Sequence, residues 1–291
     1  MIVDLSKNNL SGDIPCSMCS IPSLGRLKLS RNNLSGELSK VYTRVNVTSQ
    51  SPMSFLSLGA NILTGSIPEQ LCHLSNIHIL DLAQNNLSGS IPTCLGSLPR
   101  LKTLRTIFRL GPSSTETTFD NHMKLVIEGP EIVFTKIIPL INGIDLSSNN
   151  LVGEIPEEIT NLSTLGFLHL SWNLLTARIP ENLDNLQWLE ALDLSHNHLS
   201  SPIPPSISSM ALLNYLNLSY NNLLGQIPSS NQLQTIAYLC GPPLSINCSM
   251  PIDGDIYAKD KDGDRAEKPH FYLSALLGFF VGFWPFYAVW L

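Results

Sequence analysis

A repeat of 24 residues is the feature of this sequence that most restricts its fold. Five of the seven intervals between similarly placed asparagines are 24 residues long, the asparagines being Asn8, Asn32, Asn61, Asn85, Asn149, Asn173, Asn197 and Asn221. Around each one the chain follows L-x-L-x-x-N-x-L-x-G-x-I-P, as in "VDLSKNNLSGDIP" and "LDLAQNNLSGSIP". Self-similarity at this period indicates a solenoid of stacked coils.

Each part of the repeat has a physical role in such a coil. The two leucines of L-x-L lie two residues apart, so both point to the same side of a short strand while the residue between them points outward. The asparagine amide can bond the backbone groups that a tight turn leaves unpaired. The glycine suits a turn position. The Ile-Pro pair suits an extended segment, in which the proline has no backbone N–H donor. Stacked coils would therefore share a parallel sheet and one core.

The motif N-x-L-[ST]-G-x-I-P at this period resembles the plant extracellular class of leucine-rich repeats, found in receptor-like kinases, receptor-like proteins and polygalacturonase inhibitors. The resemblance covers about four-fifths of the chain. It implies a leucine-rich repeat solenoid of the α/β horseshoe type, with parallel strands on the concave face and a mostly irregular or 3-10 convex side. The sequence departs from this motif at Leu38, Ser39, Ala177 and Ser201, and these changes weaken individual turns but not the fold.

Two longer intervals divide the repeats into blocks. Between Asn32 and Asn61 there are five extra residues, which places "KVYTRVNVTSQSP" as a surface bulge. A non-repeat island at 105–141 separates a first block at 1–104 from a second at 142–235, and its "MKLVIEGPEIVF" predicts two strands around Gly129 and Pro130. Four repeats follow the island, as is characteristic of plant receptors of this class. The chain thus resembles a receptor-like protein.

After the repeats the sequence predicts three further segments. Residues 236–252 form a C-terminal cap, where a disulfide between Cys240 and Cys248 is implied by the similar L-C-G-P-P-L…C ending of the family. Residues 253–269 form a charged spacer. Residues 270–291 form a transmembrane helix, because 21 uncharged residues with aromatic ends match a bilayer of about 30 Å. Gly278 and Gly282 lie four apart, on one helix face where a partner helix could approach closely.

The remaining cysteines and the sequons concern the compartment. Cys72 and Cys94 fall on neighbouring coils of the convex side, where a disulfide is geometrically conceivable. Cys16 and Cys19 form a C-x-x-C that could be redox-active or a metal half-site. No second C-x-x-C or nearby histidine completes such a site, and the alternative is that both are structural cysteines.

N-x-[ST] glycosylation sequons begin at Asn9, Asn33, Asn46, Asn86, Asn161, Asn217 and Asn247. Asn46 and Asn161 are the better candidates, since several others belong to the repeat consensus.

The sequence predicts a binding protein and not an enzyme. It contains no phosphate-binding loop, nucleophile elbow or kinase motif set, and no cofactor is expected. A net charge of −6 disfavours binding of nucleic acid.

The residue before each repeat asparagine should face the concave side, which aligns Trp172, His196 and Tyr220 on three coils. Neighbouring outward positions add Phe167, His169 and Tyr215. Exposed aromatic residues are typical of recognition surfaces, although outward positions also tolerate any residue. Arg26, Lys28 and Arg31 form a basic cluster that is expected to be a solvated face.

Together these features predict a single-pass plasma membrane receptor with its repeats outside the cell, which binds a peptide or protein ligand. By resemblance, the membrane helix and ectodomain would associate with a receptor kinase that signals in defence or development. One alternative is a polygalacturonase-inhibitor-like or decoy protein. Because Met1 enters directly on a repeat strand without a signal peptide, a truncated C-terminal portion or a non-functional fragment is a further alternative.

Overall fold

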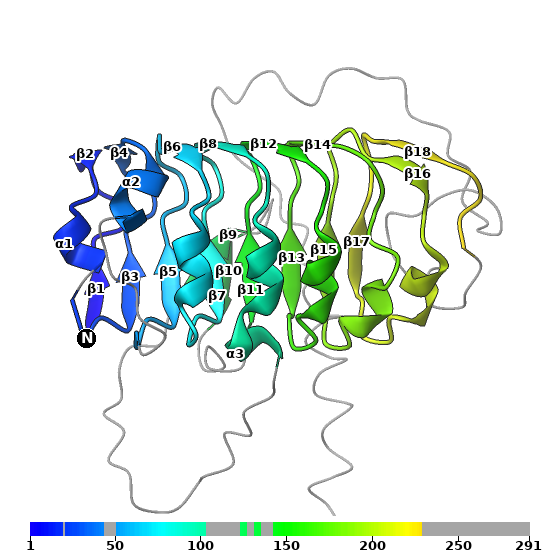
Figure 1. Ribbon diagram of the computed structural model, residues 1–291, viewed down its shortest axis with the longest axis horizontal. Coiled ribbons are helices and arrows are strands. Elements are labelled where there is room, and N and C mark those ends of the chain that lie inside the picture. The colour runs from blue at the N-terminus through cyan, green and yellow to red at the C-terminus, as the bar shows by residue number, and fades with distance from the viewer. Residues whose placement is uncertain (20, 44–50, 103–122, 127–130, 135–141, 229–291) are drawn as a thin grey trace, which may run out of the picture. The chain divides into compact units, whose positions relative to one another are not determined.

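The structure is a computed structural model, and it describes residues 1–19, 21–43, 51–102, 123–126, 131–134 and 142–228. Their main element is a parallel sheet of eight strands, one from each coil in chain order (Figure 1). The strands are β1 (Ile2–Asp4), β3 (Arg26–Lys28), β5 (Phe55–Ser57), β7 (Ile79–Asp81), β11 (Gly143–Asp145), β13 (Phe167–His169), β15 (Ala191–Asp193) and β17 (Tyr215–Asn217). The predicted solenoid of stacked parallel strands is confirmed for this part of the chain.

A second set of short parallel strands begins one to three residues after the repeat asparagines. Its members are β2 (Ser11–Asp13) with β4 (Asn33–Ser35); β6 (Thr64–Ser66), β8 (Asn86–Gly89), β12 (Asn150–Gly153) and β14 (Leu174–Leu175); and β16 (Ser200–Pro202) with β18 (Asn222–Leu224). The sequence predicted only a turn here. The difference arises because these strands have two to four residues and most approach or include a glycine, which is depleted in strands generally. Pairing with neighbouring coils compensates for this weak local preference.

The opposite side of the coils carries short helices, as the sequence predicted. In the part of the chain that the structure describes, five are 3-10 helices, namely η1 (Glu69–His73), η2 (Thr93–Ser97), η4 (Glu157–Asn161), η5 (Leu183–Asn185) and η6 (Pro205–Ser209). Four of them begin directly after the proline of Ile-Pro, which holds an extended backbone. Three short α-helices, α1 (Cys16–Cys19), α2 (Leu38–Thr43) and α3 (Pro99–Lys102), complete this side among the described residues.

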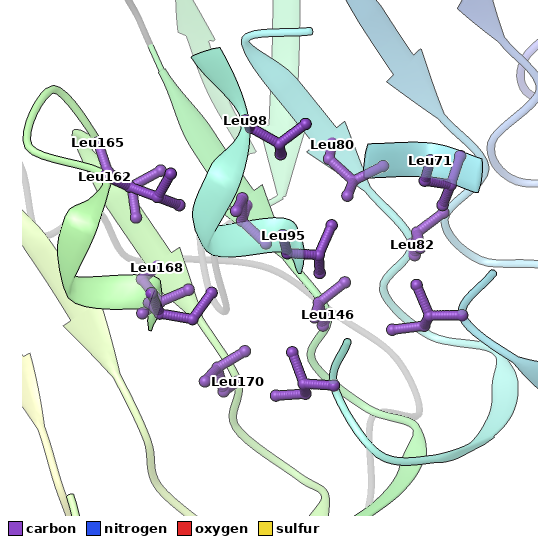
Figure 2. Close-up of a cluster of buried hydrophobic side chains, with 14 of the residues drawn as sticks. Leu71, Leu80, Leu82, Leu95, Leu98, Leu146, Leu162, Leu165, Leu168 and Leu170 are labelled. Carbon is purple, nitrogen blue, oxygen red and sulfur yellow. The ribbon is translucent and has the colours of Figure 1, made fainter. Parts of the chain in front are cut away.

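The core lies between the sheet and these helices. Figure 2 shows leucines of the strand segments meeting leucines of the helical side, and all ten labelled residues are buried. Leu80 and Leu168 are the middle residues of their strands, Leu146 directly follows β11, and Leu95 and Leu162 come from the facing helical segments. Burying a leucine side chain contributes about 1.5–3 kcal/mol. A single coil cannot bury its leucines alone, so the stacking of neighbours stabilises the fold.

Hydrogen bonds of the repeat asparagines hold the coils together. The Asn173 amide donates to the carbonyls of Leu170 and Ser171 in its own coil and to that of Leu146 in the preceding coil, at 3.0–3.2 Å. Its carbonyl oxygen accepts the Leu151 N–H at 3.0 Å. The same pattern recurs at Asn61, Asn85, Asn149, Asn197 and Asn221. The asparagines therefore form a ladder that satisfies buried backbone groups on two coils at once.

Neither long interval interrupts the main sheet. Strand β7 pairs directly with β11, so the coils on either side of the island are neighbours. Within the island, β9 (Met123–Val126) pairs antiparallel with β10 (Glu131–Phe134), which confirms the predicted pair of strands. Just before the shorter insertion, Leu38 is buried where other repeats have isoleucine, and it starts α2, which runs into the insertion as far as Thr43. The predicted bulge is therefore partly helical.

Several predictions lie outside the described residues. They concern the cap with Cys240 and Cys248, the charged spacer, the helix at 270–291 with Gly278 and Gly282, and the sequons at Asn46 and Asn247. Within the described part, no helix combines the length and apolar character needed to cross a membrane.

Candidate functional site

The candidate site is the face of the eight-stranded sheet that points away from the leucine core, which we call the sheet face. In the strands from β3 to β17 the middle residue is buried in the core, as Leu168 is, and in β1 it is Val3, which is partly buried. The two neighbours of the middle residue point to the sheet face. The residue before each repeat asparagine continues this surface at the carboxyl ends of the strands. We call those eight positions the column: Lys7, Arg31, Ala60, Gln84, Ser148, Trp172, His196 and Tyr220.

All eight residues of the column adopt left-handed backbone conformations, with φ between 51° and 58°. This geometry is set by hydrogen bonds between coils: the Trp172 N–H donates to the Ser195 carbonyl and the His196 N–H to the Ser219 carbonyl, both at 3.0 Å. Positive φ is unusual for bulky side chains. The sequence placed these residues on the surface but gave no signal of their backbone conformation, because glycine or asparagine normally marks it.

Three members of the column form an aromatic stack. The Trp172 and His196 ring centroids lie 3.7 Å apart with planes 12° from parallel, and those of His196 and Tyr220 lie 4.0 Å apart at 16°. Trp172 is 46% exposed and Tyr220 66% exposed. Partial burial lowers the pKa of His196, and the nearby Asp193 carboxylate opposes this shift. The stack is thus an exposed, ordered apolar ridge with a neutral histidine at its centre at neutral pH.

Aspartates form a second feature of the sheet face, at the last residue of four strands. One oxygen of Asp4, Asp81, Asp145 and Asp193 accepts the backbone N–H two residues further on, at 3.0–3.2 Å. Where that later residue is serine, its hydroxyl donates to the same oxygen. This oxygen therefore stabilises the strand end. The recurring D-L-[SA] pattern carried this signal, and sequence reasoning missed it.

The other oxygen of each aspartate interacts with a neighbouring coil. The Ser57 hydroxyl donates to Asp81 at 2.6 Å, His169 Nδ1 lies 3.7 Å from Asp145 Oδ2, and the Tyr215 hydroxyl donates to Asp193 Oδ2 at 3.4 Å. Burial, reinforced by the charge of Asp145, raises the pKa of Asp81 to about 7. Negative charge is therefore crowded on the coils of β7 and β11.

Charge is distributed unevenly along the sheet face. In the segments 1–7, 25–31 and 54–60, which contain β1, β3 and β5, the charged residues are Asp4, Lys7, Arg26, Lys28 and Arg31. In the segments 78–84, 142–148, 166–172, 190–196 and 214–220, which contain the other five strands, they are Asp81, Asp145, Glu190 and Asp193, with no lysine or arginine. The first region is basic and the second is acidic and aromatic.

The structure places the other three predicted ligand-binding residues on the sheet face with little exposure. The Phe167 ring lies over Gly143 of the preceding strand and is 6% exposed. His169 packs against Phe167, with ring centroids 5.3 Å apart, and is 3% exposed. Tyr215 is partly exposed. Ligand binding by all six residues stays a prediction, and the aromatic stack offers the larger accessible surface.

The remaining predicted residues lie away from the sheet face or carry local roles. Cys72 and Cys94 form a disulfide between neighbouring coils, with Cα atoms 5.8 Å apart. Cys16 and Cys19 lie in α1, and no cluster of metal-binding side chains occurs within the described ranges. The sequon asparagines Asn9, Asn33, Asn86 and Asn161 are exposed, whereas Asn217 is half-buried and accepts hydrogen bonds from Ser219.

Comparison with family models identifies the repeats. The model described as Leucine Rich Repeat matches residues 76–98, 141–162, 188–210 and 212–233. These segments are leucine-rich repeats. Because the other described coils have the same strands and asparagine bonds, the described part is a leucine-rich repeat solenoid. A comparison with curated proteins finds none that matches the sequence.

Solved structures similar to this chain include ectodomains of plant receptors. The Arabidopsis receptor kinase HAESA, in complex with the peptide hormone IDA and the co-receptor SERK1, is 31% identical over 84% of this chain and 36% of that chain, with a TM-score of 0.56. The TDR receptor is 27% identical over 76% and 31%, with a TM-score of 0.58. The plant peptide hormone receptor RGFR1 with RGF2 is 27% identical over 76% and 32%, with a TM-score of 0.51. The chain spans about a third of the length of these receptors.

Proposed function

We propose that this protein is a cell-surface recognition receptor of the plant receptor-like protein type, which binds a peptide or protein ligand on the sheet face. The aromatic stack of Trp172, His196 and Tyr220 is the observation that carries the proposal. Peptide complexes of similar solenoids support it, since HAESA and RGFR1 are both solved with a bound hormone.

The geometry of the stack favours binding over a purely structural role. Trp172 and Tyr220 keep bulky side chains at positive φ, where most residues are strained, yet leave 46% and 66% of their surface exposed. Large rigid aromatic side chains lose little conformational entropy when a partner covers them. Stacking holds the three rings in one orientation before a ligand arrives, which lowers the cost of ordering them on binding.

The remaining parts of the proposal rest on the sequence. The apolar segment at 270–291 would hold the receptor in the plasma membrane with its repeats outside the cell, and Gly278 and Gly282 would contact the helix of a partner receptor kinase. The sequons at Asn46 and Asn161 would carry glycans. Membrane fractionation tests the location. Release of the full chain by alkaline carbonate would instead favour a soluble inhibitor or decoy.

Panning of a random peptide library on the full chain tests ligand binding. Enriched peptides should bind Trp172→Ala/Tyr220→Ala at least about a hundredfold more weakly, because each exposed aromatic hot spot is typically worth about 2 kcal/mol or more. Trp188→Ala is the matched control, since Trp188 is 47% exposed but lies outside the column. Thermal unfolding should show that both variants are folded.

The variants also give the result that would contradict the proposal. Equal affinity of the enriched peptides for the wild type and the double variant would move the binding site away from the aromatic stack. A loss of affinity in Trp188→Ala as large as that in the double variant would show that the effect is not specific to the aromatic stack, and it would also contradict the proposal.

A further inference from the structure

The aromatic stack has an open end at Trp172. On the preceding coil the column continues with Ser148. The two coils are in register, because the Asn149 N–H donates to the Trp172 carbonyl at 3.1 Å and the Ser148 N–H donates to the Ser171 carbonyl at 2.8 Å. His196 covers one face of the indole at 3.7 Å. The opposite face therefore points toward the coil of Ser148, whose side chain is too small to cover it.

The space beside this face fits one planar group. Neighbouring strands lie about 4.8 Å apart, and the three rings of the stack occupy successive coils at centroid spacings of 3.7 and 4.0 Å. The column thus accommodates one flat group per coil. At the coil of Ser148 the chain supplies none, so a ligand can supply it.

The charge of the surrounding coils selects a positively charged group. Asp81, Asp145 and Asp193 lie on the sheet face from β7 to β15, and Glu190 precedes β15. No lysine or arginine lies in these strand segments. Tryptophan is the best aromatic partner for a cation, and a guanidinium is both planar and less strongly hydrated than an ammonium group. Arginine meets both requirements, while lysine meets only the requirement for charge.

We infer that an arginine side chain of the ligand stacks on the open face of Trp172 above Ser148, as a fourth layer of the aromatic stack. This inference rests on the proposed function and adds to it the chemistry of one ligand side chain. The guanidinium lies flat on the indole and its charge is balanced by the acidic coils. Higher salt weakens the charge attraction and leaves the stacking contact in place.

The test uses the full chain and three synthetic pentapeptides, acetyl-Gly-Gly-X-Gly-Gly-amide with X as arginine, lysine or phenylalanine. Tryptophan fluorescence titration gives their dissociation constants. The arginine peptide should bind at least about tenfold more tightly than the other two, as expected for a cation stacked on an indole. Trp172→Ala should remove this preference, and Trp188→Ala should retain it.

Ser148→Tyr provides a second, independent variant. Tyr220 already occupies the column at φ 53°, close to φ 54° at Ser148, so a tyrosine fits this backbone. The added ring should cover Trp172 and weaken arginine-peptide binding at least about tenfold without unfolding the coil. Unchanged binding in Ser148→Tyr would overturn the inference, because the open face would then not be the site.

The peptide series separates the other occupants. Equal binding of the lysine peptide would show that charge alone is recognised, and tighter binding of the phenylalanine peptide would show an aromatic occupant; either result overturns the inference. If arginine has no preference but library peptides still require Trp172 and Tyr220, the inference fails while the proposed function stands.

Discussion

The first three coils and the last five use the same backbone to build two different surfaces. Strands β1, β3 and β5 carry a basic sheet face around Arg26, Lys28 and Arg31, whereas β7 to β17 carry aspartates and the aromatic stack. The column has positive φ in both regions. The repeat therefore determines the coil, and its outward positions are free to determine what the coil binds.

The asparagine ladder is also less deeply buried on the first coil than in the middle of the solenoid. Asn173 is buried and bonds four backbone groups on two coils. Asn8, on the first coil, is exposed and its amide donates to the carbonyls of Leu5 and Ser6. The same residue type thus satisfies buried groups at one place and groups open to water at the other.

Replacing these two asparagines gives the largest expected difference, which is between the first coil and a middle coil of the second region. Asn173→Ala should lower the free energy of unfolding by about 3 kcal/mol, because it leaves several buried backbone groups unpaired at about 1 kcal/mol each. Asn8→Ala should lower it by less than about 1 kcal/mol. Urea unfolding of both variants measures the difference. Equal losses would mean that the ladder is not the source of coil-to-coil stability.

A second difference concerns pH. Burial and the Asp145 charge raise the pKa of Asp81 to about 7, so the folded state keeps this proton where the unfolded chain, with a pKa near 3.8, has lost it. Stability from Asp81 therefore falls as pH rises from about 4 to about 7. Asp81→Asn should be more stable than the wild type at pH 8, on the order of 1–2 kcal/mol, and similar at pH 4.

Asp4 provides the control of opposite sign. Burial pushes the pKa of Asp4 upward, but the hydrogen bonds from Ser6 and the Lys28 charge outweigh it and hold the pKa below its ordinary value. Its contribution is present at neutral pH and is lost as pH falls through that lowered pKa. Thermal unfolding of Asp4→Asn across pH should show no gain at pH 8. A gain equal to that of Asp81→Asn would contradict the proposed charge difference between the regions.

The smallest expected effect concerns the middle residue of the second, short strand of a coil, which is Gly12 in β2 and Ser201 in β16. Gly12 in the first region has φ 85° and nothing crowds its Cβ position, whereas Ser201 in the second region has φ 131° and a buried hydroxyl without a partner. Ser201→Gly should raise the free energy of unfolding by about 1 kcal/mol by removing strain. Gly12→Ala should lower it by a similar amount. A stabilising Gly12→Ala would contradict the strain argument.

Sequence periodicity was sufficient to predict the coils, the ladder and the continuity of the solenoid past the island. It placed Trp172, His196 and Tyr220 in one column because each precedes a ladder asparagine. It did not predict the burial of Phe167 and His169, because their exposure depends on neighbours such as Gly143 on the preceding strand. It also missed the second strand set and the strand-end role of the aspartates, since both depend on contacts between coils.

Paired double variants test the central claim most directly, namely that recognition belongs to the acidic and aromatic coils. The dissociation constants of library-selected peptides are measured for Trp172→Ala/Tyr220→Ala and for Arg26→Ala/Arg31→Ala in the full chain. We expect a loss of at least about a hundredfold for the first pair and less than about threefold for the second. The reverse order, or equal losses, would contradict the account.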